Sequence, residues 1–256
     1  LPPVFRLAEG SASAWKAMVA KYAVGDHTVL LSSEEFARGY PGMRPDLNAI
    51  RSWTAAFDEV RIVCVLRDQL SFLQSVYLEL AKKQAPPYWA EFLQSALRTG
   101  YAAGLHLDYS ELDKRFCTVF SEKNVRYIDY GTVGETGIAN EILLAAGMDG
   151  TLKLNGANNV RANVSPEPLV AWVASMIARP EAASPELLSI VERAMQVSRE
   201  TSFRSTLFTK DEEQRLCDKA DLWNTGLRKR LSHRQKDLAM TFPPFKRDIR
   251  RRDTLD

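Results

Sequence analysis

The chain has 256 residues, of which 45% are hydrophobic and 26% charged, and its formal net charge is +2. This length suits one large α/β domain or two small ones. The composition excludes intrinsic disorder, a collagen-like repeat and a small disulfide-built scaffold. No stretch approaches the roughly 20 apolar residues of a membrane span, and no signal peptide is recognisable at the amino end.

The first predicted element is a short strand over residues 27–31, which is apolar and rich in β-formers. Ser32, Ser33, Glu34 and Glu35 follow it. The Ser32–Glu35 spacing predicts a capping box, in which the glutamate carboxylate reaches back to the cap amide. That interpretation leaves Glu34 unexplained. A carboxylate at the ligand end of a sheet can act as a general base towards a hydroxyl.

The second predicted strand, residues 60–66, is nearly continuous in apolar and branched residues. Arg67 is the first charged residue beyond it, and Asp68 is expected to cap a helix that runs to about Lys83. Ser75 lies two turns into that helix. A forked arginine and a hydroxyl can converge on one phosphate. The alternative is an arginine in a salt bridge at the strand end and a serine that faces solvent.

A third strand is predicted over residues 124–130, and helices are predicted around and after it. Capping-box or proline signals mark their starts, and a glycine marks one end. The starts are Asp108, Thr132, Ser165, Ser184 and Thr209, and the end is Gly147. Apolar strands alternating with helices indicate an α/β fold with a central parallel sheet, followed by a helical part after about residue 165.

The carboxyl end is basic, because residues 228–256 hold ten Lys or Arg against four Asp. Such a segment can bind a phosphorylated ligand or an acidic membrane surface, or it can simply be a solvent-exposed terminus. The basic residues are not interspersed with aromatic residues in a pattern typical of nucleic-acid binding, and no recognition motif is present. No nucleic-acid partner is therefore expected.

Three cysteines, Cys64, Cys117 and Cys217, are widely spaced and form no C-x-x-C pair. They are expected to be reduced packing residues of a cytoplasmic protein. The spacing of the three histidines does not suit zinc, so no metal site is predicted.

Several of these segments together resemble the bacterial sulfotransferase family, which is similar to the carbohydrate and cytosolic sulfotransferases. The segments are residues 28–36, 63–69, 75–77, 124–130, 143–148 and 163–165. The resemblance implies a P-loop-NTPase-like three-layer α/β/α fold over residues 1–256, with a central parallel sheet. It also implies 3′-phosphoadenosine 5′-phosphosulfate as the sulfate donor, without a metal, and a small-molecule or glycan acceptor.

The resemblance implies roles for individual residues. Arg67 and Ser75 reproduce the family's arginine and serine, eight residues apart, which bind the donor's 3′-phosphate. Glu34 takes the place of the catalytic base, with Glu35 as its competitor. Late basic residues, Lys246, Arg247 or residues 250–252, are candidates to close over the same phosphate.

One family feature has no counterpart in the sequence, namely a glycine-rich, lysine-containing phosphate loop at the first strand. We expect that loop to precede Leu1. Two alternatives stay open. One is another nucleotide-dependent α/β transferase, such as a glycosyltransferase, although no Asp-x-Asp pair follows a strand. The other is a non-catalytic relative that binds a nucleotide or a partner, with an aromatic patch at Tyr88, Trp89 and Phe92 that is more typical of core packing.

Overall fold

The structure is a computed structural model, and it describes residues 12–42, 44–133, 137–148, 166–197, 204–235, 238 and 249–254. The chain divides into two compact units, each of which gathers segments far apart in the sequence. Unit 1 comprises residues 1–66, 103–155 and 223–239, and unit 2 comprises residues 67–102, 156–222 and 240–256. The expectation of a single domain over the whole chain stays a prediction.

The sheet of unit 1 is a parallel pair of strands, β1 (Ile62–Leu66) and β4 (Val125–Asp129). Leu66 pairs with Asp129, so both strands end at the same edge. Their apolar sequences predicted two parallel strands, and the structure confirms both strands and their direction.

The predicted strand over residues 27–31 is wrong, because residues 27–33 form neither helix nor strand. A strand is stabilised by hydrogen bonds to a neighbouring strand, and among the described residues the sheet of unit 1 contains only β1 and β4. Leu30 is accordingly exposed. The protein is therefore a mostly helical α/β structure, and its described residues do not show the predicted central multi-stranded sheet.

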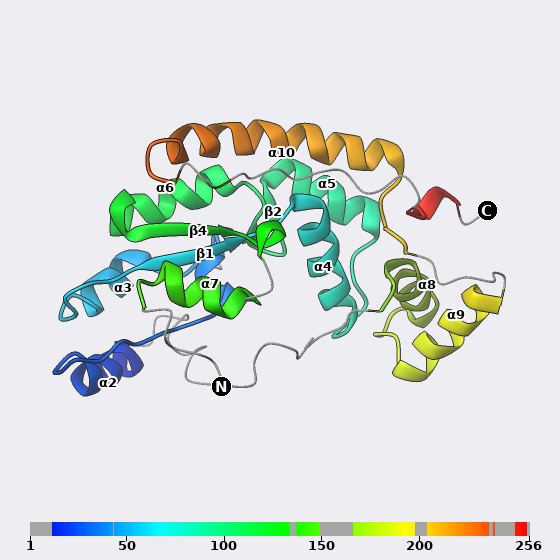
Figure 1. The fold of residues 1–256 in the computed structure, drawn as a ribbon. Coiled ribbons are helices and arrows are strands. Elements are labelled where there is room, and N and C mark those ends of the chain that lie inside the picture. The colour runs from blue at the N-terminus through cyan, green and yellow to red at the C-terminus, as the bar shows by residue number, and fades with distance from the viewer. Residues whose placement is uncertain are drawn as a thin grey trace. The chain divides into compact units, whose positions relative to one another are not determined.

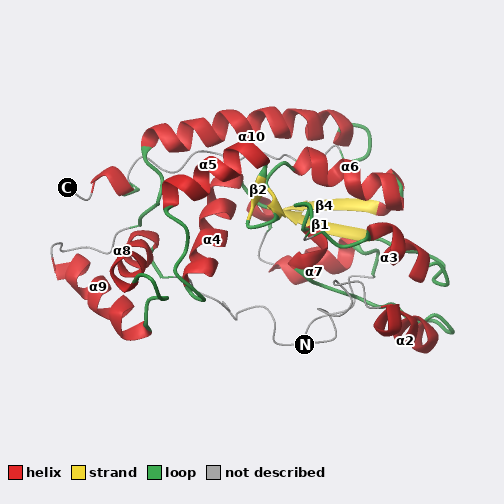
Figure 2. Ribbon diagram, turned by 180° about the vertical axis from the view of Figure 1, so that it is seen from behind, coloured by secondary structure: helices red, strands yellow, loops and turns green. Residues whose placement is uncertain are grey.

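Helices and short turns surround the strand pair in unit 1. Helix α6 and helix α7 lie on opposite sides of it (Figures 1 and 2). The elements of this unit are α2 (Ala12–Tyr22), η1 (Glu34–Ala37), α3 (Leu47–Trp53), β3 (Leu105–His106), α6 (Tyr109–Phe120), η2 (Glu122–Asn124), η3 (Tyr130–Thr132) and α7 (Gly137–Ala145). Helix α7 ends as expected at Gly147, which has a φ of 79°, a backbone conformation that favours glycine.

Unit 2 is built almost entirely from helices. Its elements are α4 (Gln69–Ala81), α5 (Trp89–Thr99), β2 (Tyr101–Ala102), α8 (Pro168–Ala178), α9 (Pro185–Val197) and η4 (Arg252–Thr254). Helix α10 (Lys210–Leu231) begins in unit 2, and its residues from Trp223 onwards belong to unit 1. The two-residue strands β2 and β3 flank the turn where the chain passes from unit 2 to unit 1.

Aromatic side chains form the centre of unit 2. The ring of Trp89 meets those of Tyr77 and Phe208 edge-on, with centroid distances of 5.1 Å and 4.9 Å. Phe92 packs against Tyr77 and Trp89. Trp89 and Phe92 are buried, which confirms that they are core residues, whereas Tyr88 is exposed and stacks on the Arg179 guanidinium.

Candidate functional site

The connection after β1 carries the first candidate residues. Arg67 follows the strand directly, and Asp68 caps α4 as expected: its Oδ1 accepts a hydrogen bond from the Ser71 N–H at 2.7 Å. Ser75 lies in the second turn of α4, one turn beyond Ser71 on the same face. Both Arg67 and Ser75 are half-buried, so each retains accessible surface.

The Ser75 hydroxyl bonds within its own helix, donating to the Phe72 carbonyl oxygen at 2.9 Å. A bound phosphate would require this proton to turn away from the carbonyl, and exchanging one neutral hydrogen bond for another costs little. The serine hydroxyl can therefore donate a hydrogen bond to a bound phosphate. The Asp68 carboxylate, in contrast, occupies the Ser71 N–H and adds negative charge at the start of α4.

The predicted capping box at Ser32 and Glu35 is wrong. Ser33 is the cap, and its Oγ accepts from the Glu35 N–H at 3.2 Å. The Glu35 carboxylate binds Arg38 with both oxygens, including a 2.9 Å bond from Nη2. The guanidinium is the stronger partner for a carboxylate because the bond is charge-assisted and bidentate. Glu34, one residue earlier in η1, is exposed.

The η1 turn is held from several directions within unit 1. Arg38 Nη1 donates to the Ala103 carbonyl oxygen at 2.5 Å, and the Gly39 N–H donates to the Gly104 carbonyl oxygen at 2.9 Å. Arg115 of α6 donates to the Arg38 carbonyl oxygen and, at 2.7 Å, to that of Pro45. Glu34 therefore stands on a braced turn, which suits a group that must act at a defined position.

A buried imidazole lies beneath this turn. His106 packs so tightly on Gly39 that a Cβ there would approach its Nε2 to 1.9 Å, so only glycine fits. Burial lowers the pKa of His106 to about 4, and the positive charge of Arg115 acts in the same direction. The ring is therefore neutral at pH 7.

The described part of the basic carboxyl end is tied to acidic side chains of unit 2. Arg251 pairs with Glu213 at 2.8 Å and Arg252 pairs with Glu212 at 2.6 Å. Lys246 and Arg247, the other candidates for phosphate binding, lie outside the described residues. These internal pairs count against the expectation that Arg251 and Arg252 close over a phosphate.

Sequence reasoning missed a polar cluster in unit 1 around Asp113, which is fully buried. Its carboxylate accepts from Arg230 at 2.7 Å, from the Tyr127 hydroxyl at 2.9 Å and from Arg234. Burial raises the pKa of Asp113, but the hydrogen bonds from the two arginines and the tyrosine outweigh it, so the pKa lies below its ordinary value. No local signal reveals this cluster, because the two arginines lie more than 110 residues from Asp113 in the sequence.

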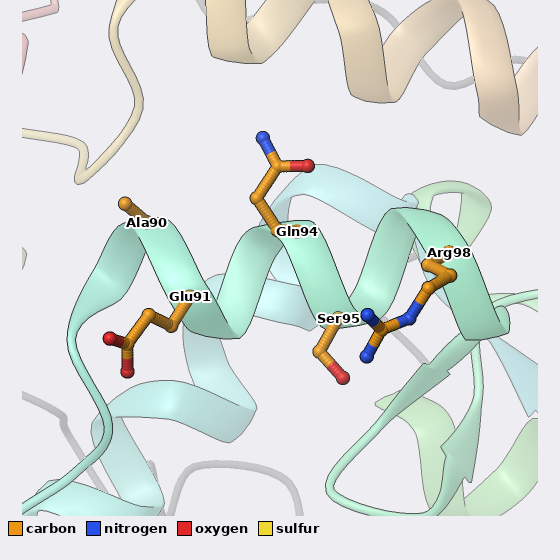
Figure 3. Close-up of a pocket in the computed structure, with 5 residues that line it drawn as sticks. All are labelled: Ala90, Glu91, Gln94, Ser95 and Arg98. Atoms are coloured by element: carbon orange, nitrogen blue, oxygen red, sulfur yellow. The ribbon is translucent and has the colours of Figure 1, made fainter.

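An open depression on unit 2 lies along one helix, α5 (Figure 3). Its lining residues are Ala90, Glu91, Gln94, Ser95 and Arg98. The figure shows that the Glu91 and Gln94 side chains point away from each other, whereas ligand sites are concave and bring a few polar groups together. This surface is therefore not the candidate site.

Among the residues that the structure describes, no group of three or more His, Cys, Asp or Glu side chains is placed to hold a metal ion. Nor is any helix in this part of the chain long and apolar enough to cross a membrane. The three cysteines are free thiols, as expected.

Comparison of the chain with known protein families, with curated proteins and with solved structures finds no match.

Proposed function

We propose that the protein is a sulfotransferase that takes a sulfuryl group from 3′-phosphoadenosine 5′-phosphosulfate and transfers it to a hydroxyl of a carbohydrate-type acceptor. The observation that carries the proposal is the connection after β1, where Arg67 directly follows a parallel strand and Ser75 lies on the capped helix α4. A P-loop-like three-layer fold with a central parallel sheet and a cytoplasmic location belong to the same proposal.

The hydrogen-bond donors at this connection suit a phosphate monoester. Arg67 supplies a permanently charged, forked donor, and Ser75 supplies a neutral one. Gln69, the first residue of α4, and Ser75 are about 9 Å apart along the helix axis. A phosphate held by Arg67 and Ser75 together would therefore lie beside the first two turns of α4. Arg67 and Ser75 would hold the 3′-phosphate of 3′-phosphoadenosine 5′-phosphosulfate, which supplies the sulfuryl group.

Glu34 is the proposed general base. An alcohol is a weak nucleophile until its proton is being removed, and an exposed carboxylate on a braced turn can accept that proton. Glu35 is a poorer candidate, because Arg38 holds its carboxylate with two hydrogen bonds and keeps it from acting as an acceptor. We assign no described residue to the 5′-phosphosulfate.

The test is titration calorimetry on the full chain with adenosine 3′,5′-bisphosphate and with adenosine 5′-monophosphate, which lacks the 3′-phosphate. The wild type should prefer the bisphosphate. Arg67→Ala removes charged hydrogen bonds and should weaken its binding about 10- to 100-fold, with a smaller effect on the monophosphate. Arg98→Ala, an exposed arginine of α5, is the matched control and should change neither affinity.

Equal binding of the two nucleotides by the wild type, or an Arg67→Ala variant that binds as tightly as the wild type, would refute the proposal. Preferential binding without sulfuryl transfer to any hydroxyl acceptor would instead favour a non-catalytic nucleotide-binding relative. Turnover of a nucleotide-sugar would favour a glycosyltransferase.

A further inference from the structure

The carboxyl-terminal segment of unit 2, residues 249–254, runs beside residues 204–206 and is called the C-terminal strap below. Ser205 and Arg250 form a parallel bridge. The Arg250 N–H donates to the Arg204 carbonyl oxygen at 3.0 Å, and the Thr206 N–H donates to the Arg250 carbonyl oxygen at 2.8 Å. The strap is therefore joined to residues 204–206 through the backbone.

Two ion pairs anchor the strap on α10. Arg251 binds Glu213, and only 11% and 8% of their side chains are exposed. Arg252 binds Glu212 and also donates from Nε to the Leu207 carbonyl oxygen at 3.1 Å. Breaking largely buried pairs of this kind is costly, because each partner is left without its counter-charge. The Arg251 and Arg252 guanidinium groups are thus already bonded to glutamates of α10 and, for Arg252, to the carbonyl oxygen of Leu207.

The other end of this network reaches α4. Oε1 of Gln74 accepts two hydrogen bonds, from the Thr206 hydroxyl at 2.9 Å and from the Leu207 N–H at 2.8 Å. Thr206 and Leu207 are fully buried. Gln74 directly precedes Ser75 in α4, so the two side chains project about 100° apart around one helix axis. Two bonds to one carbonyl oxygen restrain the rotation of α4 and with it the direction of the Ser75 hydroxyl.

We infer that the C-terminal strap sets the position of α4 for phosphate binding, acting through Gln74, and that the arginines Arg251 and Arg252 do not bind the phosphate themselves. Gln74 is then a positioning residue and not a ligand. This inference rests on the proposed function, because it assigns a role towards the 3′-phosphate that Arg67 and Ser75 are proposed to bind.

The test compares the affinities of adenosine 3′,5′-bisphosphate and adenosine 5′-monophosphate by calorimetry on the full chain. Gln74→Met keeps the side-chain length and removes the acceptor. It should weaken bisphosphate binding about fivefold and leave monophosphate binding unchanged, because only the 3′-phosphate senses the position of Ser75. Gln94→Met is the matched control, since Gln94 lies on the exposed face of α5 (Figure 3).

A second pair of variants tests the strap itself. Arg252→Met removes the ion pair with Glu212 and the hydrogen bond to the Leu207 carbonyl oxygen, and it should lower the bisphosphate preference by a similar factor, whereas Arg215→Met, an exposed arginine of α10, should not. Addition of 0.3 M salt distinguishes a positioning role from direct contact. If Arg252 contacts phosphate, its loss should abolish part of the salt dependence of bisphosphate binding, whereas a positioning role leaves that dependence intact.

The outcomes separate the two proposals. If Arg67→Ala loses the preference for the bisphosphate but Gln74→Met and Arg252→Met keep it, the inference about the strap is wrong and the proposed function stands. If the wild type has no preference, both are wrong. Should Gln74→Met fail to fold, Thr206→Val removes one of the same two hydrogen bonds, and the same comparison decides.

Discussion

Asp113 lies at the centre of a buried polar cluster that joins several elements of unit 1. It is buried, and its carboxylate joins α6 to β4 through the Tyr127 hydroxyl, to the end of α10 through Arg230, and to the turn after α10 through Arg234. Arg230 also donates to the Ser110 carbonyl oxygen at 2.7 Å. Two cations and a hydroxyl around one carboxylate satisfy its hydrogen-bonding capacity, which is the condition for a buried charge to be tolerated.

Asp113→Asn should destabilise the protein strongly. The amide has nearly the same shape, but it leaves two largely buried arginines without a counter-charge and turns one acceptor into a donor. Breaking a buried pair in this way costs about 3 kcal/mol. The free energy of unfolding in urea measures the loss.

Glu111→Gln is the matched control on the same helix, because Glu111 forms an exposed ion pair with Lys114. An exposed pair contributes about 0.5 kcal/mol or less. A loss in Asp113→Asn no larger than that in Glu111→Gln would show that the Asp113 cluster does not hold α10 to α6.

The η1 turn allows the two glutamates to be separated by function. If Glu34 is the general base, Glu34→Gln should lower kcat for sulfuryl transfer by at least about 100-fold, and nucleotide affinity should stay the same. Glu35→Gln should reduce kcat less, because it loosens the grip of Arg38 on the turn without removing the base. Single-turnover kinetics and nucleotide calorimetry on both variants measure the difference.

The reverse result, a larger loss of kcat in Glu35→Gln, would assign the base to Glu35 and make Glu34 a surface residue. Loss of nucleotide affinity in either variant would indicate a structural role for the turn. Because the two residues are neighbours of identical chemistry, each variant is the control for the other.

Local signals in the sequence predicted several helix boundaries. Asp68, Asp108, Ser184 and the Thr209–Glu212 capping box cap their helices as expected. A cap involves residues two or three positions apart, so the sequence alone contains both partners.

Two predicted helix starts are wrong, and one of them depends on a distant partner. Helix α8 begins at Pro168 and not at Pro166, because Ser205 supplies its Oγ to the Leu169 N–H from far along the chain. The cap expected at Ser165 lies outside the described residues. Thr132 does not begin α7, since its hydroxyl donates to the Asp129 carbonyl oxygen in η3 and the helix begins at Gly137.

In the candidate site, as in the helices, the sequence predicted the local features and missed the contacts between distant residues. The order of strand, Arg67, Asp68 and Ser75 is local and is present. The pairing of Glu35 with Arg38 is also local, but the capping-box pattern competed with it and the stronger ion pair prevailed. The pairs of Arg251 and Arg252 with α10 join residues about 40 positions apart, which no spacing rule detects.

For the whole molecule, the basic carboxyl end is partly neutralised by acidic side chains of the protein itself. Among the described residues of this segment, Arg230, Arg234, Arg251 and Arg252 form ion pairs with carboxylates from the acidic body. Arg230 and Arg234 do so in unit 1, and Arg251 and Arg252 do so in unit 2. A surplus of charge in one stretch of sequence therefore need not indicate an external partner, because folding brings the opposite charge to it.

The dependence of stability on pH should be dominated between pH 6.5 and 4 by His106. Its pKa is about 4 in the folded protein and about 6.5 when unfolded, so the unfolded chain binds an extra proton throughout that range. Stability should therefore fall as the pH falls, by about 3 kcal/mol in total. Asp113, with its lowered pKa, adds a further loss only below about pH 4.

His106→Gln removes this titration and should flatten the slope of unfolding free energy between pH 7 and pH 5, whatever the variant's stability at pH 7. The measurement is a series of urea titrations across that range. His233→Gln is the control, because His233 is exposed and its substitution should leave the slope as in the wild type. A His106→Gln slope equal to that of the wild type would mean that the imidazole is already solvated, and the close packing of His106 on Gly39 could then not be the source of acid sensitivity.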